Sequence, residues 1–417
     1  MKNIPDKICV IPWIHLNIDP DGTVIPCCIA STHNPVVGNV SEQSLEDIWN
    51  SSKMKSLRKE FMEGKEPIIC DKCFNKERAG NTSTRQHNND HFPHVIKRIP
   101  SITLEDGTCT EFKLRYWDFR FSNICNYKCR SCGPRHSSSW AEDARTLGYN
   151  SYKNAKPSRL LAEDDINKKV IKIDLVNNKK TTDFIDEHID EVERIYFAGG
   201  EPLLMDEHWY ILDKLHRMKK FNVKIFYNTN MSTLKSKNKH ILDYWKDFKN
   251  IDILASIDEI DKRAEIIRSG TNWKRVENNL IEMSNLQNIT VRPSITVSAM
   301  NVFRIPEIVQ RFIDIGVINK RYNYSNLSLN HLFSPNYYHV SILTDERRRM
   351  ARSHLRNFFL EMKLKYNVNL KPMFNQVMYE LNKPHTPIPR AKFFKVTESL
   401  DFIRNEKMLD AIPEILS

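Results

Sequence analysis

The sequence lacks long apolar runs and lacks the features of a secretion signal. Hydrophobic residues make up 40% of its 417 residues, yet no stretch approaches the roughly 18 consecutive apolar residues that a membrane helix needs. The N-terminal residues MKNIPDKICVIPW contain neither an apolar segment nor a small-residue cleavage site. We therefore expect no membrane segment and a cytoplasmic location. Thiols stay reduced there, which favours metal binding over disulfides for the nine cysteines.

A strong concentration of one charge sign is also absent, although the chain is basic overall. Lysine and arginine number 63 against 52 aspartate and glutamate residues, which gives a formal net charge of +11. The basic residues are spread along the chain, with only short clusters such as Lys179-Lys180 and Arg347–Arg349. This distribution favours a solvated basic surface. A nucleic-acid partner and an acidic or small anionic substrate stay open as alternatives.

Residues 1–92 are rich in turn-forming residues, and they hold five of the nine cysteines. One amphipathic helix is expected from about Ser44 to Met62, because apolar residues recur there at helical spacing. Proline and glycine punctuate the rest of this region. We expect a small cysteine-rich α+β module over 1–92.

From about residue 110 the pattern changes to strands that alternate with helices. The expected strands are 113–121, 194–198, 223–227, 252–257, 290–297 and a sixth around 321–330. The expected helices between them are 136–147, 206–219, 239–248, 273–286 and 305–315. This alternation predicts parallel βαβ units whose right-handed crossovers form a partial (β/α)6 TIM-like barrel over 110–335, an α/β fold. The polar stretch 148–190 is expected to be an insertion, and 336–417 a helical extension that begins with a long helix over 342–365.

Three cysteines, Cys125, Cys129 and Cys132, directly follow the first expected barrel strand. Thiolates are soft ligands that suit iron–sulfur clusters or zinc. Three protein ligands on a four-iron cluster leave one iron open for another ligand, much as a catalytic zinc keeps one open position. Two other interpretations of the loop stay open: a zinc site completed by a distant ligand, and cysteines that merely line a helix.

A Gly-Gly-Glu-Pro motif ends the second expected strand. Its residues are Gly199, Gly200, Glu201 and Pro202. Bare glycines let the backbone approach a ligand closely, and the glutamate can accept hydrogen bonds from an ammonium group. A simple strand-to-helix turn would use the same residues, so the motif gains its meaning from its position after the cysteine loop.

Two more polar motifs mark later strand ends. Ser256 and Asp258 end the fourth strand, and Arg268 follows as a partner for a carboxylate. The segment 227–230, Tyr-Asn-Thr-Asn, ends the third strand. Polar groups at the C-terminal ends of barrel strands line the active mouth of α/β barrels. For Ser256 and Asp258 a helix cap or turn is the alternative, and for Arg268 a surface ion pair.

The C-x3-C-x2-C spacing after the first strand resembles that of the radical S-adenosylmethionine (radical SAM) superfamily. The resemblance implies a [4Fe–4S] cluster on the three loop cysteines, with S-adenosylmethionine bound to the open iron. It assigns the cofactor's polar groups to the motif residues Gly199, Gly200, Glu201, Pro202, Ser256, Asp258 and Arg268. One departure is Ser131, because family members often carry an aromatic residue at that position, packed near the adenine.

The N-terminal cysteines form a second set. The segment from Cys9 to Cys27 is expected to form two strands joined by a Pro-Asp-Gly turn, which brings its ends together. Cys70 and Cys73 complete a four-thiolate set after the helix. Adjacent cysteines rarely both bind one metal, so we prefer Cys27 as the ligand, with Cys28 as the alternative. Spacing alone suits zinc equally well.

The pattern of these cysteines resembles the SPASM/Twitch module, which carries auxiliary [4Fe–4S] clusters in many radical enzymes. Four ligands imply one such cluster, as in Twitch modules. The departure is position, because in relatives this module follows the barrel, whereas here it precedes it. Cys109 matches no motif and is expected to be a small buried residue.

Together these resemblances imply a radical SAM enzyme. Such an enzyme cleaves S-adenosylmethionine reductively to a 5′-deoxyadenosyl radical, which abstracts hydrogen from a substrate. We expect a peptide or protein substrate and a low-potential electron donor such as flavodoxin or ferredoxin. An RNA-modifying enzyme of the same superfamily is the first alternative, and a non-catalytic iron–sulfur or zinc binding protein is the second. No single lysine, tyrosine or aspartate stands out as a proton donor.

Overall fold

The structure is a computed structural model that describes residues 4–30, 34–80, 82–147, 170–176, 179–384 and 387–416. It divides into two compact units. Unit 1 comprises residues 1–123, 170–200 and 205–225, and unit 2 comprises residues 124–169, 201–204 and 226–417. Most of the expected insertion 148–190 lies outside the described residues.

Unit 1 contains five strands in the spatial order β3-β2-β1-β4-β6. They are β1 (His15–Ile18), β2 (Thr23–Ile25), β3 (Gly38–Asn39), β4 (Tyr116–Phe119) and β6 (Arg194–Phe197). β1 and β2 pair antiparallel, which confirms the predicted hairpin. Gly22 closes the turn at φ +79°, a backbone conformation that residues other than glycine rarely adopt. β1 also pairs parallel with β4, with His15 opposite Tyr116, and β4 pairs parallel with β6.

The helix expected from Ser44 to Met62 is broken in two. α1 (Leu45–Trp49) ends at Asn50, and α2 (Ser52–Met62) begins after Ser51, whose hydroxyl accepts a hydrogen bond from the backbone of Met54. Serine is a strong N-cap, and this cap starts a second helix where the apolar periodicity predicted a continuous one. The remaining α-helices of unit 1 are α3 (Asp71–Arg78), α4 (Thr84–His91), α5 (Pro93–Ile96), α6 (Ile99–Ile102), α9 (Thr181–His188) and α10 (Asp206–Arg217).

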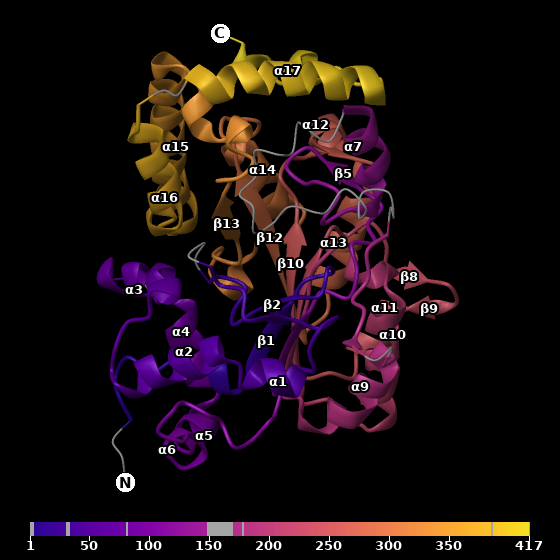
Figure 1. Ribbon diagram of the computed structural model, residues 1–417. Coiled ribbons are helices and arrows are strands. Elements are labelled where there is room, and N and C mark those ends of the chain that lie inside the picture. The colour runs from indigo at the N-terminus through magenta and orange to yellow at the C-terminus, as the bar shows by residue number, and fades with distance from the viewer. Residues whose placement is uncertain are drawn as a thin grey trace. The chain divides into compact units, whose positions relative to one another are not determined.

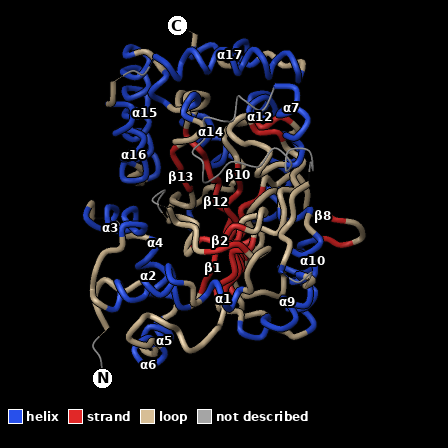
Figure 2. Tube along the Cα trace, in the orientation of Figure 1, coloured by secondary structure: helices blue, strands red, loops and turns tan. Residues whose placement is uncertain are grey.

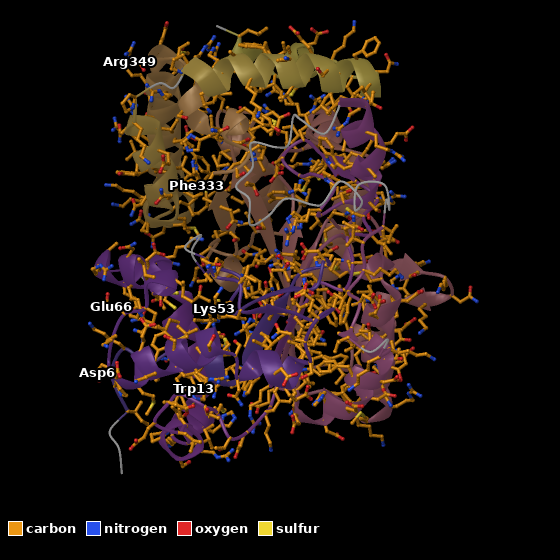
Figure 3. The ribbon with its side chains drawn as sticks, in the orientation of Figure 1. Asp6, Trp13, Lys53, Glu66, Phe333 and Arg349 are labelled. Carbon is orange, nitrogen blue, oxygen red and sulfur yellow. The ribbon has the colours of Figure 1, made fainter. Side chains whose placement is uncertain are left out.

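Buried aromatic residues tie the N-terminal segment of unit 1 together. Trp13, labelled in Figure 3, is 2% exposed and donates from Nε1 to Thr103 Oγ1 at 2.8 Å. Arg58 of α2 is fully buried, stacks 4.7 Å from the Trp49 ring and donates to the carbonyl of Pro12 at 2.9 Å. These contacts fix α2 against the segment that follows Cys9.

Unit 2 carries the later barrel strands in the order β7-β10-β12-β13. They are β7 (Lys224–Thr229), within which the boundary between the units falls, β10 (Ile251–Ser256), β12 (Ile289–Val297) and β13 (Ser328–His331). β10 pairs parallel with β12, and β12 with β13. A separate two-stranded ladder joins β5 (Lys128–Cys129) to β11 (Arg268–Ser269), and a small hairpin joins β8 (Lys235–Ser236) to β9 (Lys239–His240).

Helices flank the strands of unit 2 (Figure 2). They are α7 (Ala141–Leu147), α11 (Ile241–Trp245), α12 (Asp261–Ile267), α13 (Trp273–Ser284), α14 (Ile305–Asp314), α15 (Asp345–Tyr366), α16 (Lys371–Asn382), α17 (Pro387–Arg404) and α18 (Met408–Ala411). In Figure 1, α15 and α16 lie side by side, and α17, in yellow, passes close to α7.

The expected fold class is confirmed. Six strands, β4, β6, β7, β10, β12 and β13, occur in the predicted chain order with helices between them, and every printed pairing among them is parallel. The sixth strand is β13, at the end of the range expected for it. None of the described helices combines the length and apolar character needed to cross a membrane.

Candidate active site

The cysteine loop of unit 2 follows residue 124 and is anchored by the β5–β11 ladder. Cys129 lies in β5 directly opposite Arg268 of β11. A tight turn then brings the backbone N–H of Cys132 to 3.0 Å from the carbonyl of Cys129. Cys125 and Cys132 are half-buried and Cys129 is buried. The ladder therefore places Arg268 next to the predicted cluster ligands.

Polar donors approach two of the three sulfurs. Nη1 of Arg268 lies 3.6 Å from Sγ of Cys129, and Nδ2 of Asn230 lies 3.8 Å from Sγ of Cys125. The adjacent Cys132 thiol, as a hydrogen-bond donor, lowers the pKa of Cys129 to about 7, and the charge of Arg268 acts in the same direction. Burial instead raises the pKa of Cys125 to about 12. Donors aimed at sulfur suit thiolates that carry an iron–sulfur cluster.

Arg268 forms an ion pair with the carboxylate of Asp258. Its Nε and Nη2 lie 2.9 and 2.8 Å from Oδ2 of Asp258. The other carboxylate oxygen of Asp258 accepts from the backbone N–H of Thr296 at 2.9 Å. Ser256 ends β10 and lies opposite Ser294 of β12. These residues therefore meet at the C-terminal ends of β10 and β12.

The Gly-Gly-Glu-Pro motif forms a turn that requires glycine. Gly199 has φ +114°, and a Cβ there would lie 3.2 Å from the Cβ of Arg120, so only glycine suits the position. Glu201 is 1% exposed, and its carboxylate accepts from Thr229 Oγ1 and from the backbone N–H of Asn230, both at 2.7 Å. Burial raises the pKa of Glu201 to about 7. The glutamate thus ties the motif to the end of β7.

Trp140 and Arg404, which no sequence motif indicated, donate hydrogen bonds to the backbone of the cysteine loop. Trp140 donates from Nε1 to the carbonyl of Cys129 at 2.9 Å. Arg404, from the C-terminal end of α17, stacks 4.6 Å from the Trp140 ring and donates to the carbonyl of Lys128 at 2.8 Å and to Asp143 at 2.7 Å. No local pattern could signal Arg404, because 276 residues separate it from Lys128.

The residue between two loop cysteines is also held by the C-terminal segment. Arg130 is fully buried and forms ion pairs with Asp401 and Glu406. Its backbone N–H donates to the carbonyl of Ile267 at 2.9 Å. α17 and the residues after it therefore bond to both flanks of Cys129.

The N-terminal cysteines meet in unit 1 around one small cavity, which is lined by Cys9, Cys27, Cys70 and Cys73. Most of the remaining lining is apolar and includes Ile11, Pro12, Leu57 and Phe61. Burial raises the pKa of Cys9 well above its usual range and that of Cys70 to about 12, because a thiolate loses its solvation there. Four cysteines around one cavity fit a [4Fe–4S] cluster.

One cation and one neighbouring cysteine complete this second site. Arg85, 7% exposed, lines the same cavity and pairs with Glu77 at 2.6 Å, so a positive charge faces the thiols. Cys28 does not line the cavity. A hydrogen bond with Cys27 and burial raise the pKa of the Cys28 thiol, and the charge of the buried Asp118 acts in the same direction. Cys109 is 2% exposed, and its thiol donates to the carbonyl of Glu111 at 3.1 Å.

Family models match the two parts of the chain that hold the cysteine sets. The model of the radical SAM superfamily matches residues 119–304, and the SPASM model, an iron–sulfur cluster-binding domain, matches residues 9–74. The chain therefore carries a radical SAM domain. Its SPASM domain precedes the radical SAM domain, and iron–sulfur clusters and S-adenosylmethionine are the cofactors that these two domains imply.

A curated relative is the S-adenosyl-L-methionine-dependent 2-deoxy-scyllo-inosamine dehydrogenase of Niallia circulans. It is 33% identical over 82 residues, which are 18% of this chain and 33% of that protein, so the match spans about a third of the relative's length. Two crystal structures of SuiB from Streptococcus suis are also similar. The structure with S-adenosylmethionine has a TM-score of 0.32 at 12% identity and covers 87% of this chain and 70% of SuiB. The structure with precursor peptide SuiA has a TM-score of 0.36 at 14% identity and covers 87% and 75%.

Proposed function

We propose that this chain is a radical SAM enzyme with one catalytic and one auxiliary [4Fe–4S] cluster. The observation that carries the proposal is the cysteine loop of unit 2, where the ladder to β11 sets Arg268 beside Cys129 and Asn230 approaches Cys125. When bound, the cluster and S-adenosylmethionine supply one-electron cleavage of the sulfonium to methionine and a 5′-deoxyadenosyl radical. The proposed ligands are Cys125, Cys129 and Cys132, and those of the auxiliary cluster are Cys9, Cys27, Cys70 and Cys73.

The chain's own residues bind and orient the reactants. Arg268 donates toward Sγ of Cys129 and Asn230 toward Sγ of Cys125, which would stabilise these thiolates as cluster ligands in a buried site. Asp258 fixes Arg268 through two nitrogens, so the guanidinium keeps its position without a substrate. Gly199, Gly200, Glu201 and Pro202 form the turn proposed to receive the cofactor's amino end, and Ser256 is proposed to face its other polar groups.

The proposed substrate is a peptide or protein, because auxiliary clusters of the SPASM type often accompany peptide modification. A low-potential donor such as flavodoxin or ferredoxin would deliver the electron, and the cytoplasm would keep the thiols reduced. A second candidate is dehydrogenation of an amino cyclitol, which the match to the Niallia circulans enzyme favours. The basic net charge of +11 keeps an RNA substrate as a third candidate.

The reaction is tested with anaerobic, iron-loaded protein mixed with S-adenosylmethionine and a reductant. We expect 5′-deoxyadenosine and methionine in the wild type and neither product in Cys125→Ala. The matched control is Cys109→Ala, because Cys109 is buried but lies in neither cysteine set. A fully iron-loaded, reduced wild type that releases no 5′-deoxyadenosine would refute the enzyme proposal. Zinc in place of iron, measured by metal analysis of the anaerobically purified protein, would favour a non-catalytic zinc binding protein.

The substrate is tested separately with three probes. Small peptides encoded beside this gene should change mass and raise 5′-deoxyadenosine formation. Oxidation of 2-deoxy-scyllo-inosamine instead would favour the cyclitol reaction, and steeply salt-dependent RNA binding would favour RNA modification.

A further inference from the structure

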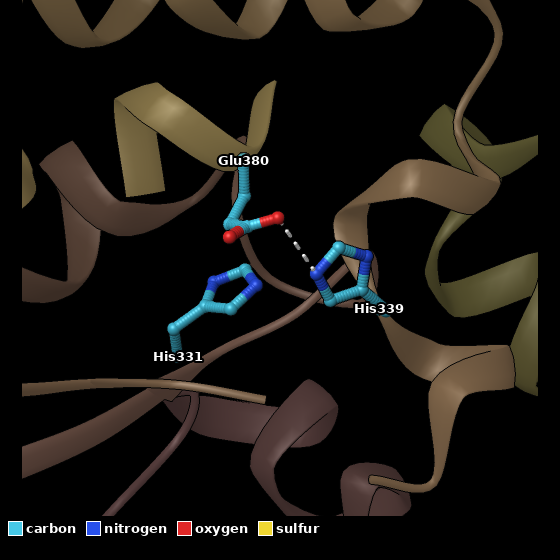
Figure 4. Close-up of side chains that lie close together, drawn as sticks. All are labelled: His331, His339 and Glu380. Atoms are coloured by element: carbon cyan, nitrogen blue, oxygen red, sulfur yellow. Dashed lines mark ion pairs between the residues drawn. The ribbon is translucent and has the colours of Figure 1, made fainter. Parts of the chain in front are cut away.

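Three side chains outside both cysteine sites converge in unit 2. His331 ends β13, His339 directly follows a short helical turn over Asn336–Tyr338, and Glu380 lies in α16. One ligand atom from each lies within 4.8 Å of one from each of the others. Figure 4 shows the two rings and the carboxylate pointing toward one another. No cysteine belongs to the group, so it is chemically distinct from the iron–sulfur sites.

His331 is the anomaly in this group. Both of its ring nitrogens are buried, and neither has a hydrogen-bond partner. The ring is enclosed by other rings: its centroid lies 4.6 Å from that of His339 and 4.9 Å from that of Phe333, which is labelled in Figure 3. Buried polar atoms are nearly always paired, so two orphaned nitrogens in one ring call for a partner that the polypeptide does not supply.

The two imidazoles are in the protonation state that a metal requires. Burial lowers the pKa of His331 to about 4 and also lowers that of His339, so both rings are neutral at pH 7. Only the neutral ring has a lone pair to give to a metal.

His339 is oriented by a second residue. Its Nδ1 accepts a hydrogen bond from the backbone N–H of Ser341 at 3.0 Å and lies 2.8 Å from the Oγ of Ser341. Its Nε2 lies 3.5 Å from the carboxylate of Glu380. Because Nδ1 accepts from the Ser341 N–H, the neutral ring carries its proton on Nε2, which faces Glu380. A metal at Nε2 would replace this proton, which would move to Nδ1 as the ring turns toward the Ser341 hydroxyl, the other partner of Nδ1.

The carboxylate of Glu380 already attracts positive charge. Glu380 is 2% exposed, and Nζ of Lys383 lies 2.8 Å from its Oε2 and 2.9 Å from its Oε1. Nε2 of Gln376 also donates to Oε1 at 2.9 Å. The side chain of Lys383 is 45% exposed and follows the last residue of α16, so its ammonium can move into water. A metal ion would compete with Lys383 for this carboxylate.

We propose that His331, His339 and Glu380 bind a divalent transition-metal ion, with zinc as the best fit. Two imidazole nitrogens and one carboxylate oxygen are a common zinc donor set, with a fourth position for water. The ion would join β13 to α16 and to the segment between them. The site has no role in the proposed radical chemistry and stands without it.

The test uses the holoenzyme with both cysteine sites filled with iron, so that free thiols do not capture zinc. After exposure to zinc and desalting, the wild type is expected to retain one zinc per chain with its iron unchanged. X-ray absorption at the zinc edge should show nitrogen and oxygen neighbours at about 2.0–2.1 Å and no sulfur at about 2.3 Å. Zinc bound through sulfur, or no retained zinc in an iron-replete sample, would overturn the proposal.

Two variants and one control keep the result attributable to these residues. His331→Gln is expected to lose the zinc and keep the iron, whereas His94→Gln, with a side chain 51% exposed, should retain both. Lys383→Met removes the competing ammonium and should lower the zinc Kd about tenfold. An unchanged or higher Kd in Lys383→Met, or zinc retained by His331→Gln, contradicts the site. Lys383→Met keeps the test valid even if a histidine variant fails to fold.

Discussion

At the scale of single residues, the two adjacent cysteines of the SPASM domain have different surroundings. Cys27 lines the cavity that Cys9, Cys70 and Cys73 share, whereas Cys28 does not. The Cys28 thiol hydrogen-bonds with Cys27, and this bond and burial raise its pKa. Sequence alone preferred Cys27 only because neighbouring cysteines rarely bind one metal together. The structure adds a physical reason for the same choice, since a ligand has to face the cavity.

This difference makes Cys27 and Cys28 a matched pair for mutation. Cys27→Ala is expected to lower the iron content from about eight to about four atoms per chain, because a four-cysteine cluster loses one ligand. Cys28→Ala should keep about eight, since the cavity retains all four thiols. Iron analysis and Mössbauer spectroscopy on anaerobic protein measure both. The reverse order would assign the ligand to Cys28, and equal iron in the two variants would contradict Cys27 as the only ligand of the pair.

At the scale of elements, α17 bonds to the loop that carries the catalytic cysteines. Arg404, the last residue of α17, contacts Lys128 within the cysteine loop. It also contacts Trp140 and Asp143, which follow the loop. Its side chain is 1% exposed and that of Asp143 is 2% exposed. A charge pair so deeply buried is costly to break, because the remaining partner keeps its charge away from water.

Replacing Arg404 with methionine tests this brace. We expect a loss of about 3–5 kcal/mol of stability, as for other broken buried ion pairs. The loop should then hold its cluster less firmly, with faster iron loss on dilution and an altered electron paramagnetic resonance signal of the reduced cluster with S-adenosylmethionine. Arg404→Lys should recover part of the effect. Phe402→Ala, on a side chain of the same helix that is 89% exposed, is the control and should behave as wild type.

Helix boundaries show where local patterns stop being informative. Apolar periodicity predicted one helix over 44–62, but the Ser51 hydroxyl caps a new helix at Ser52. The periodicity continued across the break because α1 and α2 both bury apolar residues, including Trp49 and Leu57. Capping is a local preference, and burial is shared by both helices, so the apolar pattern could not reveal the break.

At the scale of the whole molecule, each cysteine set lies within one unit. Cys125, Cys129 and Cys132 belong to unit 2 with Asp258 and Arg268, whereas the SPASM cysteines belong to unit 1. The chain order of the strands and the gathering of the N-terminal cysteines could be predicted from sequence, because their signals are short-range: alternation, spacing and turn residues. The contacts of Arg404 and the group of His331, His339 and Glu380 could not, because chain-distant residues meet there only after folding.

This separation predicts that the two clusters can be removed one at a time. A variant with Cys9, Cys70 and Cys73 replaced by serine should keep about four iron atoms and still release 5′-deoxyadenosine within a few-fold of the wild-type rate. The reciprocal variant, with alanine at Cys125, Cys129 and Cys132, should also keep about four iron atoms but release none. Loss of cleavage in the first variant with its remaining cluster intact would mean that the auxiliary cluster is needed for radical formation.

The parallel pairing of β1 with β4 has a consequence for shortening the chain. β1 comes from the SPASM domain, yet it hydrogen-bonds along the whole length of β4, from Tyr116 to Phe119. Trimming the N-terminal residues would leave β4 with a bare backbone edge, and such edges recruit strands from other molecules. By pairing with β4, β1 covers this edge and prevents self-association through it. A chain shortened to remove β1 is therefore expected to aggregate.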